Sequence, residues 1–223
     1  MLNCMKRMHR RLIIFTDKFP LLGPSIYMLC VQYLIVQPIV ASAWPLGYSW
    51  RNNYISDLGN TVCGSYAHRL VCSPEYALMN RSFIMLGLTM AVGSLLIYQE
   101  FRKSRLSLLG FSLMAAGGVG TILVGAFPEN TIAALHGLGA VFGLLVGNLS
   151  LIVLSLALTK VPRSLRIYTL LTGLFTVVSF ILFTQQITFG LGQGGMERLV
   201  SYPQTLWLTL FGLYMTRTHL RAR

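Results

Sequence analysis

The chain has 223 residues, of which 54% are hydrophobic and only 11% are charged, and its mean hydropathy is +0.64. These values lie outside the range of soluble globular domains and indicate an integral membrane protein. The net charge of +12 could suggest a nucleic-acid partner. The basic residues, however, are distributed between apolar stretches, which is typical of membrane topology. We therefore expect the lipid bilayer as a partner and no nucleic acid.

Six stretches are long and apolar enough to cross a bilayer, which takes about 20 residues. They cover residues 24–44, 82–99, 106–127, 133–159, 167–189 and 201–215. The first is too long for a cleaved signal peptide, and we expect it to remain in the protein. The sequence thus predicts one membrane domain over residues 1–223, an all-α bundle of six transmembrane helices.

The basic residues predict the orientation of this bundle. Most Lys and Arg residues lie in the two termini and in the loops after the second and fourth stretches. Short loops rich in Lys and Arg stay in the cytoplasm. We therefore expect a multi-pass protein of the cell membrane with both termini cytoplasmic.

Residues 45–81 form the only long connection and would lie on the extracytoplasmic side. Cys63 and Cys72 both fall in this loop, and an oxidising exterior would let them form a disulfide. The alternatives are two free thiols, or a metal pair that lacks its other ligands. Ser73 and Pro74 then predict the start of a helix, with Ser73 as its N-cap. A structured outer loop is expected.

Small residues recur at a spacing of four in the third and fourth stretches. The two series are Gly117, Thr121 and Gly125, and Gly139, Gly143 and Gly147. This spacing is typical of closely packed membrane helices. Since only a short turn joins the two stretches, we expect a tight antiparallel hairpin.

Polar residues gather where the spans meet the outer side. Asp57 follows the first span, Asn80 begins the second, and Glu197 precedes the sixth. His136, between Glu129 and the glycine series, should face protein. It is either a packing residue or part of a site, since intramembrane ionisable groups are costly and usually functional. Asp57, His136 and Glu197 are the catalytic candidates.

Several motifs along the chain carry a family resemblance. They are "NNYISDLGN" at 52–60, the Asn of "LMNRS", "GAFPEN" followed by "HGLGAVF", and "GGMERL". Together, from about residue 23 to residue 215, they resemble the uncharacterised membrane proteins of domain-of-unknown-function family 998. The resemblance implies a six-helix membrane fold without an assigned activity. It points to Asn53, Ser56, Asp57, Asn80, His136, Glu197 and Arg198, of which Asn53, Ser56, Asn80 and Arg198 are candidate binding residues.

A comparison with zinc-dependent membrane hydrolases limits the metal chemistry. Those enzymes use a serine, an aspartate and three histidines. This chain has Ser56, Asp57 and His136 but lacks an HxxxH motif in a late span, and His9 and His219 lie in the expected cytoplasmic tails. A three-histidine zinc site on the outer face is therefore not available. A mixed Asp, His and Glu site could still hold a cation. The sequence identifies neither a metal nor a cofactor.

Four functions remain open. The first is an enzyme acting on lipid or lipid-linked substrates at the outer leaflet, with Asp57 or Glu197 as general base or metal ligand. His136 would be acid, base or ligand, and Ser56 or Asn53 would orient the substrate. The second is a non-catalytic binding, accessory or scaffold protein whose partner the sequence does not name. A small transporter is disfavoured because no internal repeat is visible.

In the fourth interpretation the polar cluster is purely structural. Asp57 would then pair with Arg51, Arg81 or Arg198 and anchor the outer loop.

Overall fold

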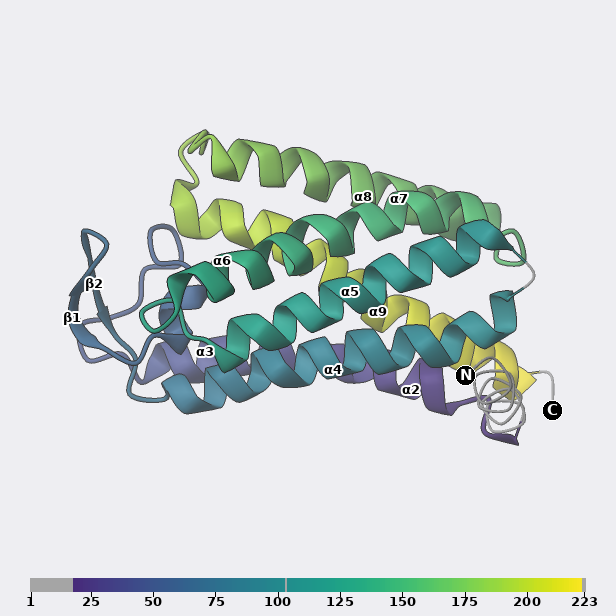
Figure 1. Cartoon of the computed structure of the whole chain (residues 1–223), viewed down its shortest axis with the longest axis horizontal. Coiled ribbons are helices and arrows are strands. Elements are labelled where there is room, and N and C mark those ends of the chain that lie inside the picture. The colour runs from purple at the N-terminus through teal and green to yellow at the C-terminus, as the bar shows by residue number, and fades with distance from the viewer. Residues whose placement is uncertain (1–17, 103, 222–223) are drawn as a thin grey trace, which may run out of the picture.

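The computed structural model describes residues 18–102 and 104–221. Its helices run side by side along the long axis of an elongated bundle (Figure 1). The first helical stretch comprises α2 (Leu22–Met28), the short 3-10 segment η1 (Leu29–Val31) and α3 (Gln32–Ser42). Further along the chain lie α4 (Tyr76–Phe101), α5 (Arg105–Ala126), α6 (Ala133–Ala140), the π-helical segment η3 (Val141–Val146), α7 (Gly147–Ala157), α8 (Arg163–Thr184) and α9 (Gly192–Arg221).

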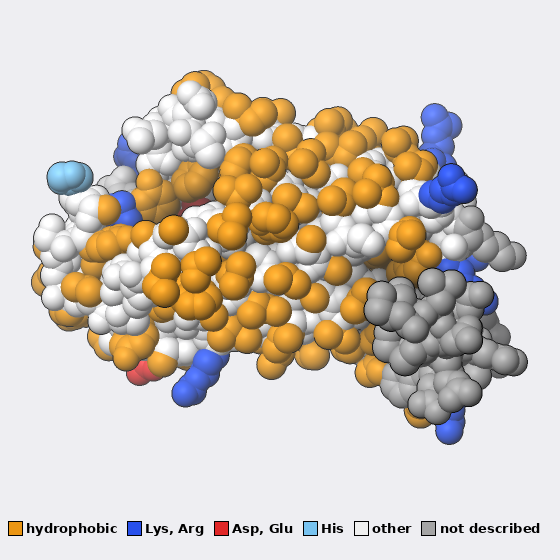
Figure 2. All heavy atoms as spheres, viewed as in Figure 1, with side chains coloured by type: hydrophobic (Ala, Val, Ile, Leu, Met, Phe, Trp, Pro, Cys, Tyr) orange, Lys and Arg blue, Asp and Glu red, His pale blue; other side chains and the backbone are white. Residues whose placement is uncertain are grey.

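Five helical segments among the described residues are long and apolar enough to cross a membrane: Leu22–Ser42, Tyr76–Phe101, Arg105–Ala126, Ala133–Ala157 and Arg163–Thr184. Apolar side chains cover the middle of the molecule on the face drawn in Figure 2. The all-α membrane bundle is therefore confirmed. α9 forms as a helix where the sixth span is expected, but it is not one of these five segments. Its role as a sixth span stays a prediction.

The glycines allow close helix packing. A Cβ atom on Gly117 would lie 2.8 Å from the Cα atom of Gly147, and one on Gly139 would lie 3.0 Å from the backbone nitrogen of Val124. α5 thus packs closely against α6 and α7, as the spacing predicts. Gly125 does not pack on α6 or α7 like Gly117, because a Cβ atom on Gly125 would lie 2.9 Å from the Cβ atom of Phe83 on α4.

The long loop is folded. It contains a 3-10 helix, η2 (Ser56–Gly59), and an antiparallel hairpin of β1 (Cys63–Tyr66) and β2 (Arg69–Cys72). Cys63 lies opposite Cys72 in the hairpin and forms a disulfide with it, which confirms the predicted bond. The predicted N-cap is wrong: α4 begins at Tyr76, and the Ser73 hydroxyl instead donates a hydrogen bond to the Leu58 carbonyl at 2.7 Å.

The hairpin lies at one end of the bundle, and the start of α2 and the end of α9 lie at the other (Figure 1). This is the arrangement that an even number of crossings would give. The side of the membrane on which each end lies stays a prediction.

Candidate functional site

Ser56 and His136 meet where the outer loop packs on the bundle. The Ser56 hydroxyl lies 3.0 Å from Nε2 of His136, and Nδ1 of the same ring lies 2.9 Å from the carbonyl oxygen of Phe127. A carbonyl oxygen only accepts, so Nδ1 carries the hydrogen in this contact. Nε2 of the neutral ring is then an acceptor for the Ser56 hydroxyl proton.

Glu197 also contacts Ser56. Its Oε2 atom accepts a hydrogen bond from the Ile55 backbone N–H at 2.5 Å, and its Oε1 atom lies 3.4 Å from the Ser56 hydroxyl. Glu197 is in the first turns of α9, before the apolar stretch that begins at Ser201. Burial raises the pKa of its carboxyl to about 7, against the lowering effect of the Ile55 N–H. Near neutral pH a protonated Glu197 can therefore donate to Ser56.

The helix η2 fixes the position of Ser56. The side-chain amide of Asn80 donates to the Gly59 carbonyl at 2.8 Å, and Ser73 holds the Leu58 carbonyl. A Cβ atom on Gly59 would lie 3.4 Å from the ring of Phe83 as well as against Asn80. Because Gly59 has no side chain, η2 can lie close to α4. Asn80 contacts the backbone that carries Ser56.

Asp57 points away from Ser56 and binds the hairpin. Its Oδ1 atom lies 2.8 Å from Nη2 of Arg69, and its Oδ2 atom accepts from Nε of Arg69 at 3.2 Å and from the Tyr54 backbone N–H at 2.8 Å. The amide of Asn53 also donates to Oδ2, at 3.1 Å. The Asp57 side chain is fully buried. Among the described residues, no hydrogen bond or ion pair links its carboxylate to His136 or Glu197.

The partner of Asp57 corrects the pairing expected for the structural interpretation. Arg69 forms the ion pair, in place of Arg51, Arg81 or Arg198. The reason is geometric. β2 carries Arg69 back toward η2 through the hairpin, and the guanidinium group then binds the carboxylate through two nitrogen atoms.

Arg69 also approaches a second carboxylate. Oε2 of Glu129, in the turn between α5 and α6, lies 3.8 Å from Nη2 of Arg69, and Oε1 accepts from Asn60 at 2.8 Å. The pKa of Glu129 is raised to about 8, mainly by burial and also by the negative Asp57, against the lowering effects of the Asn60 hydrogen bond and of Arg69. The hairpin is thus connected to the turn that precedes His136.

Arg198 holds the loop onto α9. Its guanidinium donates to the carbonyl oxygens of Trp50, Asn53 and Gly194, at 3.0, 3.1 and 2.6 Å, and also binds the hydroxyl of Tyr48. It lies 4.8 Å from the ring centroid of Trp50. The predicted binding residues Asn53, Asn80 and Arg198 therefore all bond to the protein itself, and each contacts the outer loop that carries Ser56.

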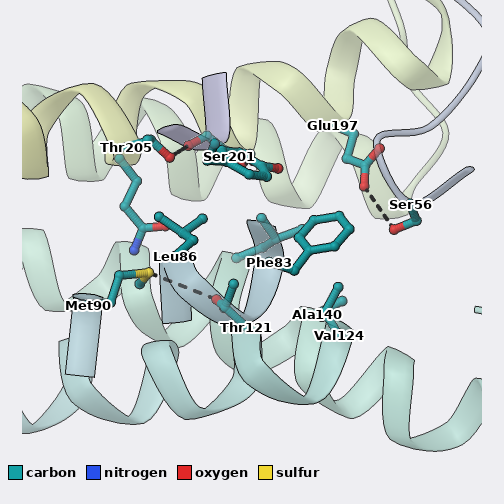
Figure 3. Close-up of a pocket in the computed structure, with 14 residues that line it drawn as sticks. Ser56, Phe83, Leu86, Met90, Thr121, Val124, Ala140, Glu197, Ser201 and Thr205 are labelled. Atoms are coloured by element: carbon teal, nitrogen blue, oxygen red, sulfur yellow. Dashed lines mark hydrogen bonds between the residues drawn. The ribbon is translucent and has the colours of Figure 1, made fainter. Parts of the chain in front are cut away.

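A narrow cavity extends from Ser56 into the bundle, and it leaves about 40 Å³ for the centres of water molecules. In Figure 3, Ser56 and Glu197 lie at one end, Met90 and Thr205 lie at the other, and Phe83 and Leu86 lie between them. The full lining comprises Tyr33, Ser56, Phe83, Leu86, Met90, Thr121, Val124, Ala140, Gly143, Leu144, Glu197, Ser201, Gln204 and Thr205.

Side chains that could hold the cation considered above would have to lie close together. Among residues 18–102 and 104–221, no group of three or more His, Cys, Asp or Glu side chains is close enough to hold a metal ion. The candidate site instead combines a hydroxyl, an imidazole and a carboxyl group. That set is suited to proton transfer and nucleophilic chemistry.

Sequence reasoning missed the role of Arg69 and gave Ser56 only an orienting role. The available signal for Arg69 was its place between the two cysteines, where a disulfide hairpin fixes the direction of the strand. The available signal for Ser56 was its position next to Asp57, which the sequence predicts as a catalytic candidate.

The fold and the site define a helical membrane protein with a polar cluster at one end of its bundle. The chain belongs to a family of proteins of unknown function, DUF998, whose family model matches residues 28–214. Comparisons with curated proteins and with solved structures gave no match.

Proposed function

We propose that this protein is a membrane enzyme that cleaves an ester of a lipid or lipid-linked substrate, with Ser56 as the nucleophile. One observation carries the proposal. Ser56 is hydrogen-bonded to a histidine whose second nitrogen is held by a backbone carbonyl, and Ser56 itself lines one end of a cavity. A nucleophile, a base and a group that orients the base are the common elements of nucleophilic catalysis.

The reaction would take place in two steps. The Ser56 oxygen attacks the ester carbonyl carbon while Nε2 of His136 takes the hydroxyl proton. The bond from the carbonyl carbon to the alcohol oxygen then breaks, and His136 returns the proton to the leaving alcohol. A water molecule, activated by His136 in the same way, hydrolyses the acyl-serine and releases the acid.

Glu197 would act in its protonated form. Its Oε2 atom accepts from the Ile55 N–H, so Oε1 carries the proton toward Ser56. From this position it can donate a hydrogen bond to the negative oxygen that develops during the attack. Asp57 would be a positioning residue, because its bonds to Arg69 and to the Tyr54 backbone N–H hold the loop segment that carries Ser56.

The proposal includes the predicted topology. With both termini in the cytoplasm, Ser56 lies at the outer leaflet of the cell membrane, and its substrate enters from that leaflet. A hollow on the face drawn in Figure 2 opens toward the strand-bearing end, and acidic side-chain atoms are visible inside it.

The second candidate is a non-catalytic binding or scaffold protein. It is favoured by Leu46 and Leu70, which are 77% and 67% exposed on the outer loop and could contact a partner protein. It predicts no chemistry at Ser56.

Ester hydrolysis by the purified protein in detergent micelles separates the two. A fluorogenic short-chain ester should be hydrolysed by the wild type, and Ser56→Ala should lose roughly 10³-fold or more of the activity. Ser65→Ala, in exposed strand β1, is the matched control and should retain it. Equal rates for Ser56→Ala and the wild type would refute the proposal.

A further inference from the structure

The cavity beyond Ser56 extends along α9. Glu197 lines its outer end and Thr205 its inner end, and eight residues of helix measure about 12 Å. About 40 Å³ of this cavity is open to the centres of water molecules, and over that length such a space, called the channel below, suits a slender group better than a bulky one.

Apolar side chains form part of the channel wall, beside the polar side chains of Tyr33, Ser201 and Gln204. Phe83, Leu86 and Met90 line it from α4, and Val124 lines it from α5. The hydroxyl groups of Thr121 and Thr205 donate to the Gly117 and Ser201 carbonyls at 3.0 and 3.2 Å, and the hydroxyl groups of Tyr33 and Ser201 lie 3.1 Å apart. Because these hydroxyl groups already have partners in the protein, a hydrocarbon chain in the channel would leave none of them without a hydrogen bond.

From this geometry we infer that the cavity binds one unbranched acyl chain of the ester substrate and that its inner end sets the chain length. This inference rests on the proposed function and specifies the substrate class of the same site. The carbonyl group lies at Ser56 and the chain follows α9 toward Met90. Ala140, which contributes to the lining from the end of α6, is small enough to leave the channel open.

Two variants with matched controls test the inference. Met90→Ala enlarges the inner end, and Leu88→Ala is its control on the exposed side of the same helix. Ala140→Leu narrows the channel, and Ala134→Leu is its control at an exposed position of α6. The measurement is kcat/KM for p-nitrophenyl esters with saturated chains of increasing length.

In the wild type, each methylene that enters the cavity should raise kcat/KM about fourfold until the channel is full. Ala140→Leu should lose roughly tenfold or more on the longer esters and retain the acetate ester. Met90→Ala should move the optimum to longer chains, and both controls should follow the wild type. If Met90→Ala does not fold, Ala140→Leu still decides the outcome.

A binding measurement separates this inference from the proposed function. A radiolabelled, unbranched saturated fatty acid should bind to the Ser56→Ala protein and bind at least tenfold more weakly after Ala140→Leu is added. Hydrolysis of the acetate ester with one chain-length profile for all variants would overturn the acyl site and leave the enzyme. Fatty-acid binding that depends on Ala140, without any ester hydrolysis, would support the chain site and overturn the enzyme.

Discussion

Nε2 of His136 lies 3.0 Å from the hydroxyl oxygen of Ser56, although the two residues are 80 positions apart in the chain. The contact depends on two separate structures. η2 presents Ser56 on the outer loop, and the carbonyl of Phe127 fixes the ring of His136 at the start of the fourth span. Both partners are therefore held in place before a substrate binds, which is what pre-organised proton transfer requires.

Replacing His136 tests its role as base. His136→Asn should lower kcat for ester hydrolysis by about 10²- to 10⁴-fold, because a general base contributes a factor of this size. His68→Asn is the control, since His68 is exposed in the hairpin turn and has a φ of 63°, which asparagine tolerates. Equal activities of the two variants would remove His136 from the mechanism.

The pH profile tests the protonated form of Glu197. Its pKa is raised to about 7 by burial, so the proton is present below that pH and is lost above it. Activity that needs this proton should fall as the pH rises through about 7. Glu197→Gln keeps a hydrogen-bond donor without a titrating proton, and it should remove this alkaline decline. A decline that persists unchanged in Glu197→Gln would contradict the assignment.

Removing Arg69 tests the anchor of the outer loop. Arg69→Met leaves the buried Asp57 carboxylate without its ion pair and should lower the free energy of unfolding by about 3 kcal/mol. Arg81→Met is the matched control at an exposed position of α4, and it should change stability by less than about 0.5 kcal/mol. Thermal unfolding in detergent provides the comparison. Identical unfolding temperatures would show that the pair does not anchor the loop.

Glu129 should make stability depend on pH. Its pKa in the folded protein is about 8 and its ordinary value is 4.5, so the folded state binds the proton more tightly than the unfolded state between these pH values. Stability should therefore fall as the pH rises from about 4.5 toward 8. Glu129→Gln should flatten this part of the curve. If the stability of the wild type and that of Glu129→Gln change with pH in the same way between about 4.5 and 8, Glu129 is not the source of the pH dependence.

The fold could be predicted from the sequence because hydropathy and small-residue spacing are local properties of each span. The disulfide between Cys63 and Cys72 and the packing of Gly117 on Gly147 follow from such local patterns. The pairing of Asp57 with Arg69 could not be predicted in this way. It depends on the path of the hairpin, which carries Arg69 back over η2, and one-dimensional spacing does not contain that path.

The candidate site shows the same division. The positions of His136 and Glu197 at the outer ends of their spans predicted that they lie near Ser56 and Asp57. They did not predict whether Ser56 or Asp57 would face them. Ser56 and Asp57 are consecutive residues of η2, and the bonds of Asp57 to Arg69 and to the Tyr54 N–H direct its carboxylate toward the hairpin. Ser56 is the residue that remains beside His136.

Covalent labelling tests the nucleophile most directly. The purified protein is incubated with a fluorophosphonate, which reacts with an activated serine, and the modified residue is located by peptide mass spectrometry. The adduct is expected on Ser56 in the wild type and in the His68→Asn control, and it should be lost or strongly slowed in His136→Asn. Absence of an adduct on Ser56, or equal labelling in the wild type and His136→Asn, would contradict a histidine-activated Ser56.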